Sequence, residues 1–188
     1  MQKTSRTRLL AESAVMIALA LVLNFIKFSK LPYGGETTLA SMLPILLICI
    51  KNGPRWGFLT AFVYSLIQLF MSLGEVAAWG LTPTVFIICI LFDYIVAYSI
   101  LGVASFFGRG SRTKAICGVA LAIFLRFVCH FITGITIWAN WVDGFKAVML
   151  YSLTYNGSYM LPELILSLVI MILLVQVPQI RKILGIQK

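Results

Sequence analysis

The side chains best suited to bind a small molecule gather in residues 126–157, RFVCHFITGITIWANWVDGFKAVMLYSLTYNG. They include His130, the only histidine of the sequence, and the group that follows it: Trp138, Trp141, Tyr151, Tyr155 and Asn156. An imidazole can donate and accept hydrogen bonds, and aromatic faces stack on flat rings and attract delocalised cations. The segment therefore predicts a pocket for a small, flat molecule that is uncharged or cationic.

Asp93, in the segment LFDYIVAY, is the carboxylate expected to join this pocket. A carboxylate can accept hydrogen bonds from the edge of a heteroaromatic ring. Asp93 has a structural alternative, because it could pair with Arg126, one helical turn before His130. Glu163 is a second candidate partner for Arg126, and we assign it a structural role. Arginines and glycine-rich helix starts, which favour phosphate groups, are scarce near the expected pocket.

The composition requires these residues to be positioned by membrane-spanning elements. Hydrophobic residues make up 61% of the sequence and charged residues 11%, and the mean hydropathy is +1.00. Soluble domains are about half apolar and about one quarter charged. A chain of 188 residues with this balance cannot hide its apolar surface in one aqueous core, so it is an integral membrane protein.

Continuous apolar runs predict an all-α fold, a single membrane domain (residues 1–188) with six transmembrane helices. Helices are favoured over a barrel because the runs do not alternate every second residue. The second run is short and contains Pro44, which predicts a tilted or kinked span. The six runs cover approximately 9–26, 39–50, 56–73, 84–107, 115–138 and 156–177.

The basic residues predict the orientation of these spans. Eleven of the fifteen lysines and arginines fall on the side that holds both termini, which the positive-inside rule assigns to the cytoplasm. This places Asp93, His130 and the aromatic residues in the outer half of a cell (plasma) membrane protein. The net charge of +9 follows from topology and anionic lipid and needs no nucleic acid. Nothing after the first run resembles a signal-peptide cleavage site, so we expect a retained span.

Each candidate side chain also has a purely structural explanation. Trp138 and Trp141 could belong to an aromatic belt at the membrane interface, and a single membrane histidine can simply hydrogen-bond a neighbouring helix. The four cysteines are scattered without CxxC pairing, which predicts neither a disulfide nor a metal site. A shared pocket explains all the polar residues together, whereas each alternative explains only one.

Several segments resemble the thiamine-specific S-component of energy-coupling factor (ECF) transporters, the ThiT family. They are RFVCHFITGITIW, YSLTYNGSYMLP and LFDYIVAY, together with RLLAESAVMIALA and MLPILLICIKNGPRWG, so the resemblance covers nearly the whole chain. The most specific feature is the spacing H-x-x-x-G-x-x-x-W from His130 to Trp138.

The resemblance implies a role for each residue of the predicted pocket. Asp93 would hydrogen-bond the aminopyrimidine of thiamine, Tyr94 would lie near the thiazolium, and Trp138 would stack on the pyrimidine. The same resemblance implies further polar contacts from three residues: His130, Tyr151 and Asn156. Thiamine is a flat aminopyrimidine joined to a cationic thiazolium, which is the type of ligand that the residues themselves predict.

Glu36 is the least certain match to this pattern. Some family members have an acidic residue early in the second span that faces the thiazolium, and that position here is Leu39. Glu36 lies three residues earlier, in the predicted loop, so either Glu36 acts from there or the pocket relies on aromatic contacts. The loop 28–37 contains a proline and two glycines, which suits a mobile lid or an ordinary connector.

Ala14 and Ala18 form a small-residue pair on the first span, which lets another helix approach closely. The pair could pack within the chain; the resemblance implies instead that it faces the transmembrane coupling protein of an ECF module. The sequence has no GxxxxGK[ST] motif, so two cytoplasmic ATPases would have to supply the energy. No cofactor is expected.

The sequence thus predicts a thiamine-capture subunit that is not an enzyme. One alternative is a proton-coupled secondary transporter that uses Asp93 or His130 as a relay, although the chain lacks detectable inverted halves. A membrane enzyme would need a metal-ligand or nucleophile group that one histidine and scattered acids do not supply. A thiamine precursor is an alternative ligand.

Overall fold

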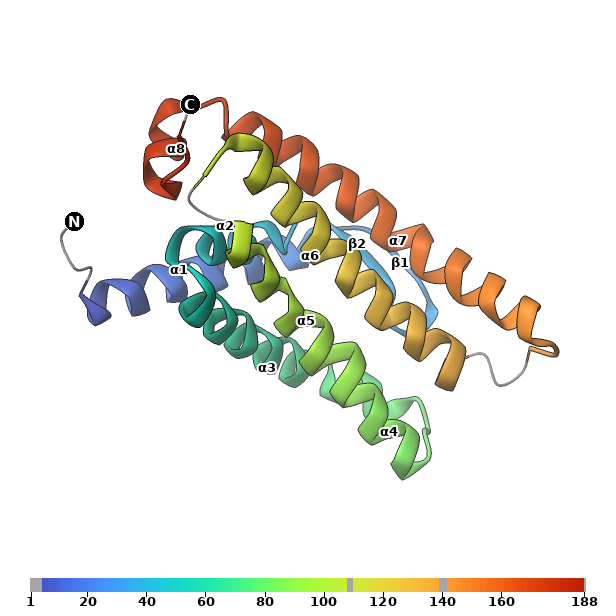
Figure 1. Cartoon of the computed structure of the whole chain (residues 1–188). Helices are drawn as coiled ribbons and strands as arrows, with labels where there is room; N and C mark the ends of the chain where they lie inside the picture. Colours follow the sequence, from blue (N-terminus) through green and yellow to red (C-terminus); the bar gives the residue numbers. More distant parts are fainter. Residues whose placement is uncertain (1–4, 108–109, 139–141, 188) are drawn as a thin grey trace.

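The computed structural model describes residues 5–107, 110–138 and 142–187, which form a bundle of helices with one short β-hairpin (Figure 1). The elements are, in order, α1 (Arg6–Phe25), β1 (Lys27–Lys30), η1 (Pro32–Gly34), β2 (Glu36–Thr38), α2 (Leu43–Asn52), α3 (Pro54–Ala78), α4 (Pro83–Cys89), η2 (Ile90–Val96), α5 (Ala97–Ser99), η3 (Ile100–Phe107), α6 (Arg112–Thr133), η4 (Gly134–Trp138), α7 (Phe145–Leu174) and α8 (Pro178–Leu184).

Five helical segments of the described chain are long and apolar enough to cross a membrane, which needs about 20 residues. Elements α4, η2, α5 and η3 form one of them without interruption, and α6 with η4 forms another. This confirms the predicted helical membrane protein. The five segments are Arg6–Phe25, Pro54–Ala78, Pro83–Phe107, Arg112–Trp138 and Phe145–Leu174.

The second predicted span differs from the others because only its later part is helical. Helix α2 has ten residues and begins at Leu43, so Pro44 lies in the first turn, where its missing N–H costs no hydrogen bond and causes no kink. The hairpin of β1 and β2 precedes it, and Thr37 and Thr38 of β2 are buried. The hairpin thus occupies the predicted loop 28–37, and the second span is shorter than predicted because its helix begins at Leu43 rather than at residue 39.

Helix α7 begins earlier than the sequence pattern suggested, at Phe145 rather than near residue 156. The helix break lies at Gly144, whose φ of 91° favours glycine, and not at the polar residues that follow. Tyr151, Tyr155 and Asn156 therefore project from a continuous helix of 30 residues. A helical backbone holds them more rigidly than the loop edge that the sequence implied.

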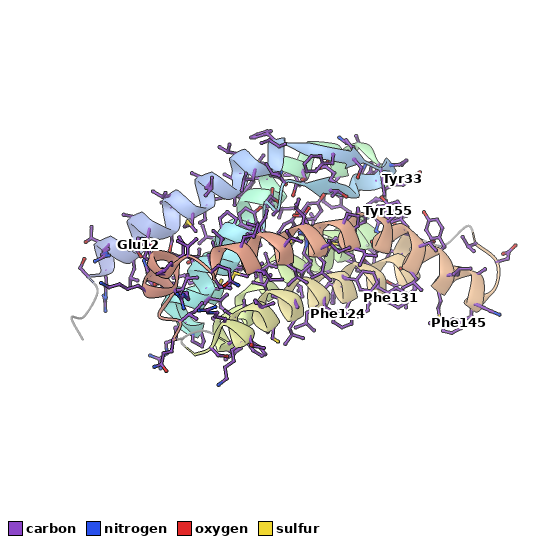
Figure 2. All side chains as sticks on the ribbon, turned by 90° about the horizontal axis from the view of Figure 1, so that it is seen from above. Glu12, Tyr33, Phe124, Phe131, Phe145 and Tyr155 are labelled. Carbon is purple, nitrogen blue, oxygen red and sulfur yellow. The ribbon has the colours of Figure 1, made fainter. Side chains whose placement is uncertain are left out.

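The bundle has two distinct ends. Both chain termini and α8 lie at one end (Figure 1), and a polar cluster there ties α1 to its neighbours. In that cluster Glu12 pairs with Lys51 at 2.8 Å, and Trp56 Nε1 donates to Ser13 Oγ at 2.8 Å. Figure 2 shows Glu12 near this end, with Tyr33 and Tyr155 toward the opposite end.

Helix α7 packs closely against the end of α6 and the start of η4, where Gly134 faces α7. Ser152 Oγ donates to the Phe131 carbonyl at 2.8 Å, and Asn156 Nδ2 donates to the His130 carbonyl at 3.1 Å. A methyl group on Gly134 would overlap Ser152 Oγ and lie 2.9 Å from Asn156 Nδ2. The close approach therefore requires glycine at this position.

Replacement of Gly134 by alanine is expected to force α6 and α7 apart and to lower the free energy of unfolding by about 1–3 kcal/mol, the usual cost of overpacking. The measurement is the melting temperature of the purified protein in detergent. Gly74→Ala on α3 is the matched control, because no atom lies within 4 Å of the added methyl group. An unchanged melting temperature for Gly134→Ala would contradict the packing described here.

Candidate functional site

A cavity of about 260 Å³ lies beneath the hairpin, enclosed by α3, η2, α6, η4 and α7. Its volume is near the lower end of small-ligand pockets, which measure about 300–1,000 Å³. The structure places all seven residues proposed from the sequence as ligand contacts in its wall. They are Glu36, Asp93, Tyr94, His130, Trp138, Tyr151 and Asn156.

Asp93 is the centre of the polar network in this cavity. Its Oδ1 accepts from Thr133 Oγ1 at 2.5 Å and lies 2.9 Å from His130 Nδ1, and its Oδ2 accepts from Trp138 Nε1 at 3.2 Å. Asp93 lies in η2 and Trp138 in η4, and both elements are π-helical. Wide π turns within α-helices are frequent at functional sites.

The hydrogen bonds of His130 indicate a neutral ring. An ionised carboxylate can only accept, so the hydrogen bond between Asp93 and Nδ1 places a proton on Nδ1. Arg126 Nε lies 3.3 Å from Nε2 and donates to it, which requires a lone pair there. His130 therefore connects a guanidinium to a carboxylate through a neutral imidazole.

Arg126 does not form either of the two ion pairs considered from the sequence. Within the described chain no salt bridge joins it to Asp93 or Glu163; its guanidinium lies over the Tyr98 ring, 3.9 Å from the centroid, and also contacts Met42 Sδ. Arg126 approaches Asp93 only through His130. His130 lies between Arg126 and Asp93, whereas Glu163 accepts its hydrogen bonds from Thr38.

Glu163 is buried and holds the inner end of the hairpin. Its Oε2 accepts from the Thr38 backbone N–H at 2.8 Å, and its Oε1 accepts from Thr38 Oγ1 at 2.9 Å. Burial of a carboxylate is costly unless donors satisfy it, and β2 supplies those donors here. Glu163 thus positions the segment that covers the cavity.

Three aromatic rings from separate elements cluster at the outer part of the cavity. Trp79 and Trp138 meet edge to face with centroids 5.3 Å apart, and Tyr33 lies 5.5 Å from Trp138 and 6.2 Å from Trp79. Sequence reasoning missed Tyr33 and Trp79. The signal for Tyr33 was its place between a proline and two glycines, and its φ of 60° shows that the turn is held in a strained conformation.

The hairpin closes over the cavity through α7. Gly35 N–H donates to Tyr155 Oη at 3.2 Å, and Tyr155 O–H donates in turn to the Pro32 carbonyl. Thr37 Oγ1 donates to the Tyr159 carbonyl at 3.3 Å. The segment expected to be a lid or a connector is therefore a structured cover, hydrogen-bonded to α7 at both ends.

Glu36 lies in β2 rather than in a loop, and lysines surround its carboxylate. Lys27 Nζ lies 2.7 Å from it, Lys30 Nζ lies 3.8 Å from it, and Lys30 also lies 3.4 Å from Glu75 on α3. Glu36 does face the cavity. It does so as part of an ion network that connects the hairpin to α3.

Two further residues singled out in the sequence, Ala14 and Ala18, lie outside the cavity wall. Ala14 and Ala18 are exposed on α1, whose buried residues are Ser13, Ile17 and Ala20. Packing within the chain therefore does not explain the small-residue pair. Trp141 lies outside the described residues.

The charges of the wall suit a cation. Four carboxylates and two cationic side chains line the cavity, so its formal charge is negative. Among the described residues no group of three or more histidines, cysteines or acids could hold a metal ion. The arrangement combines hydrogen-bond acceptors, a neutral imidazole and aromatic faces. The lining charges are Glu36, Glu75, Asp93 and Glu163 against Lys27 and Arg126.

Comparisons of the sequence and of the structure with known proteins all match thiamine transporters. Residues 10–182 match the family model described as thiamine transporter protein (Thia_YuaJ). The chain is 31% identical to the thiamine transporter ThiT of Bacillus subtilis, with 88% of each chain covered, and 26% identical to ThiT of Lacticaseibacillus paracasei, with 96% of this chain and 93% of the relative covered. A solved structure of ThiT from Listeria monocytogenes superposes with a TM-score of 0.72 at 25% identity, covering 94% of this chain and 98% of that one.

Replacement of Tyr155 by phenylalanine is expected to loosen the hairpin, because it removes the hydroxyl that joins Gly35 and Pro32. The loss of hydrogen bonding, worth about 1 kcal/mol, should speed amide hydrogen exchange in residues 32–38 by roughly fivefold. Thr154→Val is the control, since that exposed hydroxyl bonds only carbonyls of its own helix. Equal exchange in wild type and Tyr155→Phe would show that the hydroxyl does not hold the cover.

Proposed function

Since the chain belongs to the ThiT family of thiamine transporters, whose members transport rather than catalyse, we propose that it takes up thiamine by binding it in the cavity beneath the hairpin. The observation that carries this proposal is the Asp93 network, a carboxylate held by His130, Thr133 and Trp138 inside that cavity. This network offers a hydrogen-bond acceptor at a fixed position inside a bundle of largely apolar helices.

The aminopyrimidine is the part of thiamine that suits the Asp93 network. The exocyclic amine would donate to Asp93, and Trp138 would provide the face on which the ring stacks. His130, Tyr151 and Asn156 would complete the polar contacts from α6 and α7. Asn156 supports such a role because it is buried and fixed by the His130 carbonyl and Tyr159 Oη.

The thiazolium would lie among the aromatic rings and acidic groups. Tyr94 lines the cavity together with Tyr33 and Trp79, and a cation over an aromatic face gains about 0.5–2 kcal/mol. The negative formal charge of the wall adds a longer-range attraction. Glu36 is a further candidate contact for the cationic ring, although lysine ammonium groups already approach it.

We further propose that this chain is the substrate-binding S-component of an ECF module in the plasma membrane. Both termini would face the cytoplasm, in keeping with the excess of basic residues on their side and with their common end in Figure 1. Ala14 and Ala18, exposed on α1, would face the coupling protein, and two cytoplasmic ATPases would supply the energy. Toppling of the whole subunit in the membrane would then release thiamine inward.

Thiamine is expected to quench the tryptophan fluorescence of the detergent-purified protein in a saturable way, because stacking would occur on Trp138. Asp93→Asn should weaken binding by roughly 10- to 100-fold, since it replaces a charged hydrogen-bond acceptor with a neutral amide of the same shape. Asp143→Asn, an exposed carboxylate outside the cavity, is the control. The thiamine assignment fails if neither thiamine nor its pyrimidine half gives a saturable change.

Ala14→Leu is expected to reduce thiamine uptake by cells that contain a coupling protein and ATPases, while thiamine binding in detergent stays unchanged. The larger side chain would prevent the close approach of a partner helix on the exposed face of α1. Val15→Leu, at a neighbouring exposed position, should retain uptake. Uptake by this chain alone that an uncoupler abolishes would instead favour a proton-coupled transporter.

A further inference from the structure

We propose that Lys27 is a tethered cation that occupies the Glu36 carboxylate in the empty cavity and competes there with a cationic ligand. Lys27 would then limit the affinity of the pocket for thiamine and set how strongly the pocket prefers cations. This inference rests on the proposed function, because it concerns how the same cavity discriminates between ligands.

The contact between Lys27 and Glu36 involves both oxygens of the carboxylate. The Lys27 ammonium lies 2.7 Å from Oε1 and 2.7 Å from Oε2, so it engages both oxygens of the carboxylate. Both side chains line the cavity, and they are only 33% and 17% exposed. The ammonium therefore occupies the position that a ligand cation would need in order to reach Glu36.

Pairing between the strands does not explain this contact. In the hairpin register Glu36 faces Lys30, and Lys27 faces Thr38. Simple cross-strand pairing would therefore join Glu36 to Lys30, yet Lys30 Nζ lies 3.8 Å away and closer to Glu75. Lys27 reaches Glu36 diagonally, along the side of the hairpin that faces the cavity.

The charges of the wall explain why the pocket would hold such a cation. Within the described part of the chain, Lys27 and Arg126 are the two cationic side chains in the cavity wall. Arg126 is engaged by Tyr98 and His130, and Lys30 lies outside the wall and 3.8 Å from the carboxylate, so Lys27 is the wall cation that pairs directly with Glu36. An unpaired carboxylate beneath the cover would be costly, and an exchange between Lys27 and the ligand keeps Glu36 paired both with and without ligand.

Competition of this kind favours charged ligands selectively. A cationic ring that displaces the ammonium gains the Glu36 carboxylate and loses the repulsion from Lys27, whereas a neutral ring does neither. Removal of one positive charge from the wall of a partly exposed pocket should strengthen binding of a monovalent cation by about threefold to tenfold. The affinity for a neutral ligand should stay the same.

The test compares thiamine with its neutral aminopyrimidine half, 4-amino-5-hydroxymethyl-2-methylpyrimidine, on detergent-purified wild type and Lys27→Gln. Dissociation constants come from tryptophan fluorescence or calorimetry. We expect Lys27→Gln to bind thiamine at least threefold more tightly and to bind the neutral half as wild type does. Lys27→Arg, which keeps the charge, should show no gain.

Lys146→Gln is the matched control, because Lys146 is an exposed lysine at the start of α7, outside the cavity wall, and its loss should not change thiamine binding. Equal or weaker thiamine binding by Lys27→Gln, with the neutral half still bound, would overturn the inference. So would an equal gain for Lys146→Gln, which would reveal only an effect of net charge. If wild type binds no thiamine, the proposed function itself fails.

Discussion

The Asp93 carboxylate lies inside an apolar bundle, and its need for hydrogen-bond donors fixes much of the structure around it. The donors come from α6 and η4, where Thr133, His130 and Trp138 are spaced along one side of the helix. For these groups to reach one carboxylate, η2 must face α6 at this depth. Gly134, within the same stretch, then allows α7 to approach from the other side. The Asp93 carboxylate thus holds η2 against α6 and η4, and Gly134 allows α7 to pack against the same stretch.

The buried carboxylate of Glu163 explains how a non-helical segment is accommodated beside these helices. Exposed strand edges are not tolerated in the hydrocarbon layer, so non-helical backbone there must be covered by protein. Glu163 binds both the backbone N–H and the hydroxyl of Thr38, and Tyr155 and Tyr159 satisfy polar groups nearer the turn. The turn and β2 are therefore bound to α7, and α7 carries contacts for the cover as well as for the cavity.

The sequence was most informative about charged and polar residues within the membrane spans, because such residues must face a partner or a cavity. Asp93 and His130 were placed in a pocket because such groups need partners there, and the structure brings them within 2.9 Å of each other. The hairpin could not be predicted, because its strands are short and the burial of its threonines depends on hydrogen bonds to Glu163, which is far away in the sequence. Trp79 was missed for a similar reason, because it lies at the end of α3, far in sequence from the histidine segment. The two ion pairs considered for Arg126 do not form, because His130 lies between Arg126 and Asp93 and Thr38 donates to Glu163.

The hairpin carries Tyr33, Lys27 and Glu36, so its position controls both the aromatic faces and the charge of the outer cavity. Opening of the hairpin would withdraw Tyr33 from Trp79 and Trp138 and remove Glu36 from the wall at the same time. Asp93, His130 and Asn156 belong to helices and would stay. In the proposed binding mode the helices would contact the pyrimidine, whereas the hairpin would supply the aromatic and charged contacts to the cationic ring. Movement of the hairpin would therefore weaken the contacts to the cationic ring first, while the Asp93 network stays preformed on the helices.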